Sequence, residues 1–271
     1  MERLSGASET ADWEAFISGP RLGGLVVEYG NYRERASRPV VRREVARPEV
    51  VVVFELDDPL TVAGREFVSF ASGIVAGATK TAHGGRQVCV EVRLTPLGAY
   101  RLFGVPMESL TGQAVDLELL WPRAREVRER LAAAVSSQDR FALLDRELGR
   151  ALDRGPEPDR VVEHVWRELV RTRGDVSLGA LVQESGADRG RLAKRFRVQV
   201  GATPKAAAKA MRFHRAVELL ARDGDLASIA AVCGYYDQAH LNRDFRVLAG
   251  CSPTRLLGAR LHDLPGTAWE S

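Results

Sequence analysis

A short segment near the C-terminus carries the side chains best suited to reading base pairs. On a helix over residues 238–246, the polar residues Gln238, Asn242, Arg243 and Arg246 share the face opposite an apolar pair spaced four residues apart. Gln and Asn can contact adenine through two hydrogen bonds, and Arg can read guanine or hold a phosphate. We predict base contacts by the first three and a backbone contact by Arg246. The candidate DNA-contacting residues of this segment are Gln238, Ala239, His240, Asn242, Arg243 and Arg246.

A second segment, residues 189–197, is basic but offers fewer groups that can read bases. Its expected exposed face includes Gly190 and Ala193, which are too small to hydrogen-bond a base edge. Either this helix holds mainly phosphates, or its small residues let it approach thymine methyl groups closely. We expect it to read less sequence than the 238–246 segment. Its candidate DNA-contacting residues are Arg189, Arg191, Lys194 and Arg197.

Both segments belong to a pattern that occurs twice, 48 to 49 residues apart. Each copy has a short apolar helix pattern, a glycine (Gly186 or Gly234), a second helix pattern, and a Thr-Pro or Ser-Pro pair. Such a repeat indicates a duplicated helix-turn-helix unit, in which the glycine permits the tight turn. Thr203-Pro204 starts a long predicted helix between the copies. That helix would hold two recognition helices roughly 34 Å apart, at successive major grooves.

The second copy, Ile229 to Arg246 followed by Gly250-Cys251-Ser252-Pro253, resembles the signature of the AraC/XylS family of regulators. The resemblance covers about residues 160–260. It implies a DNA-binding domain of seven helices, a non-palindromic half-site, control of nearby promoters, and RNA polymerase as a partner. The family motif also places DNA contacts at the positions given above. Residues 94–104 are similar to uncharacterised sensor-like domains of such regulators, and this second resemblance carries no known ligand.

Motifs for catalysis are missing from the sequence. It has no Gly-x-Ser-x-Gly, no His-Glu-x-x-His, no phosphate-binding Gly-x-x-x-x-Gly-Lys and no dinucleotide fingerprint. His83 has no partner at metal-ligand spacing, and Cys89 lacks the basic setting that activates a thiol. Cys233 and Cys251 are expected to be small buried residues. We therefore expect no enzyme activity, no metal and no cofactor.

The chain before residue 155 changes from strand-like to helical patterns. Thr95 and Pro96 predict the start of a helix over 97–103. The fold class we predict is α+β: a strand-rich N-terminal domain (a sandwich or barrel, or an α/β sheet) with following helices, then an all-α domain with two helix-turn-helix units joined by a long helix. The predicted strands are 22–30, 49–56, 65–71 and 86–94. The predicted divisions are a sensor-like domain (1–120), amphipathic helices (121–154), a linker (155–159) and the DNA-binding domain (160–262).

The amphipathic helices have two possible roles. Val127, Leu131, Ala134 and Val135 line one face, and the following helix has a similar apolar face. These faces either close the N-terminal core or form the seam of a homodimer.

Composition agrees with a polyanion-binding part joined to another function. Residues 160–271 hold eighteen Lys and Arg against twelve Asp and Glu, whereas residues 1–159 hold 21 against 24. No run of eighteen apolar residues or signal peptide is visible, and the dispersed cysteines suit a reducing compartment, so we expect a cytoplasmic protein without membrane contact.

The sequence is compatible with three hypotheses for the function of the whole chain. The first is a regulator that binds double-stranded DNA and responds to a small-molecule effector. The second is a regulator whose N-terminal domain serves only dimerisation or protein contacts, and the third is an enzyme fused to a DNA-binding domain. For the first, the candidate ligand-lining aromatic residues are Tyr29, Phe54, Phe67, Phe70 and Tyr100.

Overall fold

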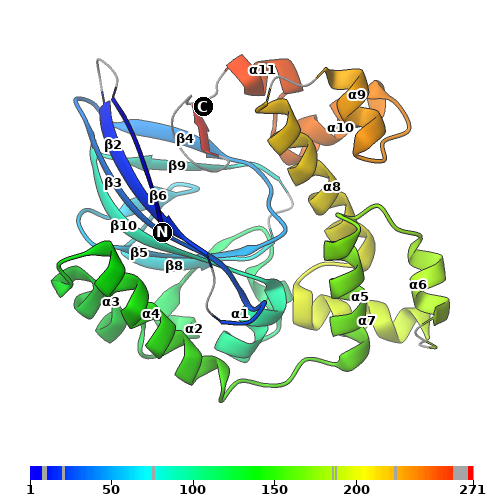
Figure 1. The fold of residues 1–271 in the computed structure, drawn as a ribbon, viewed down its shortest axis with the longest axis horizontal. Helices are drawn as coiled ribbons and strands as arrows, with labels where there is room; N and C mark the ends of the chain where they lie inside the picture. Colours follow the sequence, from blue (N-terminus) through cyan, green and yellow to red (C-terminus); the bar gives the residue numbers. More distant parts are fainter. Residues whose placement is uncertain are drawn as a thin grey trace.

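The computed structural model has two parts, a strand-rich N-terminal part and a helical C-terminal part (Figure 1). The two parts lie against each other along one side of the strands. The fold class predicted from the sequence is confirmed. The structure describes residues 1–7, 11–19, 22–74, 77–184, 186, 188–222, 225–258 and 268–270.

The N-terminal part contains two antiparallel sheets. The larger has the strand order β1-β2-β3-β10-β5-β8-β11, and the smaller has the order β12-β4-β9-β6-β7. The bounds of the larger sheet are β1 (Glu2–Ala7), β2 (Ala11–Ser18), β3 (Val26–Ala36), β5 (Val50–Glu55), β8 (Ser69–Ser72), β10 (Arg86–Leu94) and β11 (Ala114–Asp116). Those of the smaller are β4 (Val40–Glu44), β6 (Leu60–Val62), β7 (Arg65–Phe67), β9 (Thr79–His83) and β12 (Ala268–Glu270).

Alternation along the central strands gives the larger sheet two different faces. On β5, Val50, Val52 and Phe54 belong to the main core, while Val51 and Val53 point to the other side. On β10, the apolar positions from Val90 to Leu94 join the same core, and the residues between them are charged or polar. One face of the larger sheet therefore packs against the main hydrophobic core. The other face presents charged and polar side chains to the space between the two sheets.

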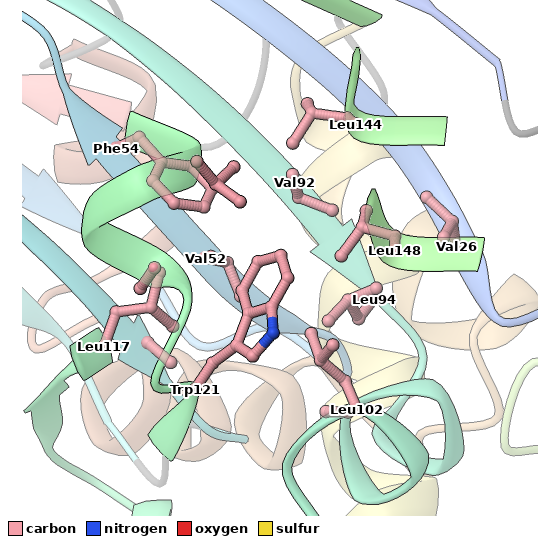
Figure 2. Close-up of a cluster of buried hydrophobic side chains, with 14 of the residues drawn as sticks. Val26, Val52, Phe54, Val92, Leu94, Leu102, Leu117, Trp121, Leu144 and Leu148 are labelled. Carbon is pink, nitrogen blue, oxygen red and sulfur yellow. The ribbon is translucent and has the colours of Figure 1, made fainter. Parts of the chain in front are cut away.

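Helices cover the hydrophobic face of the larger sheet. They are α1 (Pro96–Phe103), η1 (Met107–Leu110), α2 (Leu117–Leu120), α3 (Ala124–Ala133) and α4 (Ser137–Leu152). Figure 2 shows Trp121 and Leu117 packed beside Phe54 and Val52, with Leu144 and Leu148 of α4 over Val92. As predicted, α1 is capped by Thr95, whose hydroxyl accepts a hydrogen bond from the Gly98 amide at 3.0 Å.

The two amphipathic helices close this core. Val127 and Leu131 are fully buried in it, so their face is not available as a dimer seam. Val135 was predicted to join them, and this is wrong: α3 ends at Ala133, and the Val135 side chain is 97% exposed. A helical period cannot orient a residue that lies beyond the helix.

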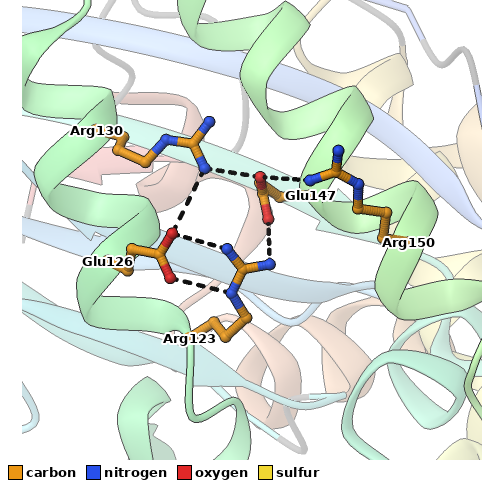
Figure 3. A network of polar contacts seen from close by, with 5 residues as sticks. All are labelled: Arg123, Glu126, Arg130, Glu147 and Arg150. Atoms are coloured by element: carbon orange, nitrogen blue, oxygen red, sulfur yellow. Dashed lines mark hydrogen bonds and ion pairs between the residues drawn. The ribbon is translucent and has the colours of Figure 1, made fainter.

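A buried carboxylate holds α3 and α4 together (Figure 3). The Glu147 side chain is inaccessible to solvent and forms ion pairs with Arg123 and Arg130 at 2.8 Å and with Arg150 at 3.4 Å. Glu126 adds a second carboxylate beside Arg123. Because three guanidinium groups surround one buried carboxylate, its charge is compensated.

Seven helices follow in the described part of the C-terminal region. They are α5 (Arg160–Arg171), α6 (Leu178–Glu184), α7 (Arg189–Val200), α8 (Pro204–Leu220), α9 (Leu226–Val232), α10 (Gln238–Leu248) and α11 (Pro253–Gly258). In Figure 1, α8 connects the α6–α7 unit to the α9–α10 unit. Gly186 and Gly234 have φ angles of 62° and 70°, the left-handed conformation that each turn requires. Within the described residues, no helix is long and apolar enough to cross a membrane.

The strand predictions were incomplete. The 86–94 and 49–56 predictions match β10 and β5 closely, whereas the predicted strand at 65–71 is divided into β7 and β8, which lie in different sheets. The 22–30 prediction overlaps only the start of β3, and the strands β1, β2, β4, β6, β9, β11 and β12 were missed. Charged residues interrupt the apolar pattern in several of them, including Val40–Glu44.

Candidate DNA-binding surface and interdomain cavity

The second recognition helix, α10, is fixed by its cap and its buried face. The Asp237 carboxylate accepts a hydrogen bond from the His240 amide at 2.6 Å, which is the predicted N-cap. Leu241 and Phe245 are fully buried, and the Phe245 ring lies 5.0 Å from that of Phe213 on α8. Lys209 of α8 also forms an ion pair with the buried Asp244 of α10 at 2.9 Å. The position of α10 therefore depends on α8.

The opposite face of α10 presents polar side chains. Gln238, Ala239, Arg243 and Arg246 are exposed, and Asn242 is half-buried. His240 is also half-buried, and its ring contacts that of Tyr235 edge-on at 5.1 Å, so packing occupies part of its surface. The structure thus brings together a surface with amide and guanidinium donors at helical spacing.

The first recognition helix, α7, presents a more uniformly basic surface. Asp188 caps it by accepting a hydrogen bond from the Arg191 amide at 2.8 Å. All four predicted basic residues are exposed: Arg189, Arg191, Lys194 and Arg197. Arg195, which was not predicted, forms an ion pair with Asp159 at 2.6 Å and so ties α7 to the start of α5. The signal for this role is an N-cap aspartate that precedes α5.

A cavity of about 500 Å³ lies between the two sheets and reaches the C-terminal helices. Strand residues from both sheets line most of it, and α8 completes the wall with His214 and Glu218. Its apolar lining includes Trp13, Ile17 and Val62. A cavity of this size accommodates a small organic molecule.

Of the five predicted ligand-lining aromatic residues, only Phe70 is among the residues that line this cavity. Tyr29 and Phe54 lie on the helix-covered face of the larger sheet, and Tyr100 packs against the same core. Phe67 packs against Phe70 with ring centroids 5.5 Å apart. These four residues are not among those that line the cavity, because aromatic character alone does not distinguish the two faces of a strand.

The polar lining of the cavity is concentrated around Arg47. Its guanidinium is surrounded by the carboxylates of Glu91, Glu49 and Glu44, which interact with it through charge. Burial raises the pKa of Glu91 to about 6, against the opposing effect of Arg47. Burial also raises the pKa of Glu49 above its usual value. The guanidinium therefore compensates the surrounding carboxylates only in part.

Two further polar groups of the cavity are paired. Glu34 forms an ion pair with Arg42 and a hydrogen bond of 3.0 Å with Nε2 of His83. The Gly85 amide donates to Nδ1 of His83 at 3.3 Å, which assigns the proton to Nε2. Burial opposes it, but the His83 hydrogen bond and Arg42 lower the pKa of Glu34. His83, for which the sequence shows no partner at metal-ligand spacing, is buried beside the Glu34 carboxylate.

The α8 wall carries a neutral imidazole. Burial, together with the nearby charges of Arg47 and Arg93, lowers the pKa of His214 to about 4. Its Nδ1 lies 3.4 Å from Oε1 of Glu218, one turn further along the helix. Near neutral pH the His214 ring is therefore uncharged, and the proton on Nδ1 is directed toward Glu218.

The N-terminal domain holds both helix-turn-helix units. The Ala46 amide donates to the Leu248 carbonyl at 3.1 Å, and Arg43 donates to the Ala249 carbonyl at 3.0 Å, both at the end of α10. The Thr111 hydroxyl donates to the carbonyl of Gly201 at 2.6 Å, at the end of α7. These contacts fix the relation of each recognition helix to the sheets. Among the described residues, no cluster of three or more potential ligands is placed to hold a metal ion.

Comparison with known proteins agrees with this architecture. Residues 181–259 match a family model described as a helix-turn-helix domain. No curated protein matches the chain. The solved structure of ToxT from Vibrio cholerae aligns with 92% of this chain and 98% of its own, at 9% identity and a TM-score of 0.50. ToxT bound to an unsaturated fatty acid aligns with 83% and 96%, at 10% identity and a TM-score of 0.44.

A third solved structure, the xylose-binding transcription activator XylR, aligns with 40% of this chain and 29% of its own, at 21% identity and a TM-score of 0.33. The family match lies in the region of the sequence repeat, and the ToxT alignment extends over both domains. Residues 181–259 therefore resemble helix-turn-helix domains, and the chain as a whole has the fold of ToxT.

Proposed function

We propose that this protein is a sequence-specific transcription regulator whose grip on double-stranded DNA is controlled by a small molecule in the interdomain cavity. The observation that carries the proposal is the position of α8 (Pro204–Leu220), which lines the cavity and also joins the two helix-turn-helix units. A ligand in contact with α8 therefore reaches the element that relates the two recognition helices. In the cell, the resemblance makes RNA polymerase the partner at the regulated promoter.

In this proposal, the two recognition helices have different roles in DNA binding. On α10, Gln238, Asn242 and Arg243 read bases and Arg246 holds the backbone, because their surface combines amide and guanidinium donors. The exposed basic residues of α7 (Arg189–Val200) hold phosphates, which position the protein without reading sequence. On α10, Ala239 and His240 flank these contacts.

The DNA-binding half of the proposal is tested by selecting genomic fragments with the purified full chain at two salt concentrations. We expect one motif of two unequal half-sites about one helical turn apart. Binding without a motif that disappears steeply with salt would show only phosphate contacts and would contradict sequence-specific regulation.

The effector half is tested with the variant Val51→Trp, because Val51 lines the cavity on β5 and a larger side chain there fills it. The selected motif gives a DNA probe for affinity measurements with and without extracts of small molecules from the producing cells. We expect an extract fraction to change the DNA affinity of the wild type but not that of Val51→Trp. A fraction acting equally on both proteins would place its effect outside the cavity.

A further inference from the structure

We propose that the effector of this cavity is an organic cation, an amine with an apolar body, whose charge is held by glutamates around Arg47 and on α8. This inference rests on the proposed function, because it names the ligand class of the same cavity. The cavity combines an apolar wall with an excess of carboxylates, and these two features together describe the ligand.

The lining of the cavity carries more carboxylates than cations. Seven glutamates and five arginines line the cavity. Five of these glutamates lie around Arg47 and Arg93, namely Glu28, Glu44, Glu49, Glu91 and Glu218. Glu28 pairs with Arg93, and three others surround Arg47. His214 adds no positive charge near neutral pH because its pKa is lowered to about 4. Carboxylates therefore exceed cations, and a bound cation restores the balance.

In the described part of the chain, several buried hydrogen-bonding atoms of the cavity lining have no hydrogen-bond partner. Within the described residues, Oε2 of Glu49 and Nε2 of His214 are buried and receive no hydrogen bond. With its proton on Nδ1 facing Glu218, the neutral His214 ring offers Nε2 as an acceptor. An ammonium group, which has only donors, satisfies acceptors of this kind.

A carboxylate ligand is the competing possibility. Nη1 of Arg47 and Nε of both Arg42 and Arg93 are also buried without a hydrogen-bond partner, and they are donors that an anion would accept from. However, a bound anion would add negative charge beside Glu91, Glu49 and Glu44, which already surround the Arg47 guanidinium. The excess of carboxylates therefore favours the cation.

The apolar residues of the cavity lining account for the apolar body of the proposed ligand. Trp13, Ile17, Val53 and Phe70 offer hydrophobic surface from strands of the larger sheet. Burial of aromatic or aliphatic groups there supplies affinity, while the carboxylates select the charge.

The test uses three probes that share one body, namely 4-phenylbutylamine, 4-phenylbutan-1-ol and 4-phenylbutanoate. Their binding to the full chain is measured by titration calorimetry at pH 7.5. We expect the amine to bind at least tenfold more tightly than the alcohol, and the carboxylate to bind most weakly. Val51→Trp should abolish amine binding, which places the probe in the cavity.

The charge preference is tested with Glu49→Gln, and with Glu91→Gln if the first variant does not fold. Either change should reduce the advantage of the amine over the alcohol by about tenfold or more. The matched control is Glu66→Gln, an exposed position on β7 that should leave all three affinities unchanged.

Two results would overturn this inference. If the carboxylate binds most tightly, the cavity selects anions through Arg47, and effector control of DNA binding still stands. If no probe binds, the cation assignment fails. Failure of the proposed function looks different, because the genomic selection would then yield no motif, or effector fractions would act equally on Val51→Trp.

Discussion

Glu55 makes the stability of the N-terminal domain fall as the pH rises toward about 8. It lies at the end of β5, is 1% exposed, and accepts a hydrogen bond from Nε2 of Gln87 at 2.9 Å. Burial raises the pKa of this carboxyl to about 8, a value that the hydrogen bond from Gln87 only partly offsets. No cation is among the groups that influence it.

The direction of the pH dependence follows from the numbers of protons bound by the folded and unfolded chains. Because the pKa of Glu55 is higher in the folded than in the unfolded chain, the folded chain binds the extra proton between about pH 4.5 and 8. The stabilisation is complete below the unfolded pKa and is lost as the pH rises through the folded pKa. Each unit in this window lowers the free energy of unfolding by about 1.4 kcal/mol, so about 2 kcal/mol is lost between pH 6.5 and 8.

The assay compares urea denaturation of the wild type and Glu55→Gln at several pH values. The neutral amide keeps an oxygen for Gln87 and does not titrate. We expect the free energy of unfolding of the variant, relative to the wild type, to rise by about 2 kcal/mol between pH 6.5 and 8. His214, whose pKa is lowered to about 4 in the folded chain, changes the free energy of unfolding below pH 6.5. Its contribution is the same in the wild type and in Glu55→Gln, so it cancels in the difference between them. Glu66→Gln controls for removal of an exposed charge. A difference that stays constant with pH would refute the reasoning.

Three further predictions concern the DNA-binding domain. Phe245→Ala should lower the free energy of unfolding by about 3 to 5 kcal/mol, measured by urea denaturation, because the ring is fully buried against Phe213; a loss below 1 kcal/mol would contradict this packing. Asp237→Ala should cost about 1 kcal/mol by the same measurement through loss of the α10 cap, and an unchanged midpoint would argue against the cap. Asn242→Ala should change base preference more than Lys194→Ala in binding-site selection; the reverse order would assign sequence reading to α7.

The sequence predicted the C-terminal domain well because local signals there agree. Thr203 caps α8, Asp237 caps α10, and positive φ angles occur at Gly186 and Gly234, as the repeat requires. Each of these features depends on residues within one or two turns. The period of the pattern was enough to place the apolar face of each helix.

The cavity was not predictable in the same way. Along β10, Glu91 and Arg93 alternate with Val90 and Val92, a pattern that normally places the charged face in solvent. Here the charged face is turned toward the second sheet and α8, so it lines the cavity. Which face is covered depends on the pairing of distant strands, and no local period contains that information. Charged residues that alternate with apolar ones on neighbouring strands were the sequence signal for the cavity lining, whereas aromatic residues did not indicate it.

The interdomain contacts determine how a cavity ligand can act. The α7 end is held through Thr111 and the α10 end through Arg43 and Ala46, while α8 between them faces the cavity. A ligand in contact with α8 cannot shift this helix without changing its relation to both held ends. Because DNA requires a defined spacing between the recognition helices, even a small shift of α8 changes the fit at one major groove. Under the proposed function, a ligand controls DNA binding only if it binds two arrangements of α8 with different affinities, and His214 and Glu218 are the α8 residues that line the cavity.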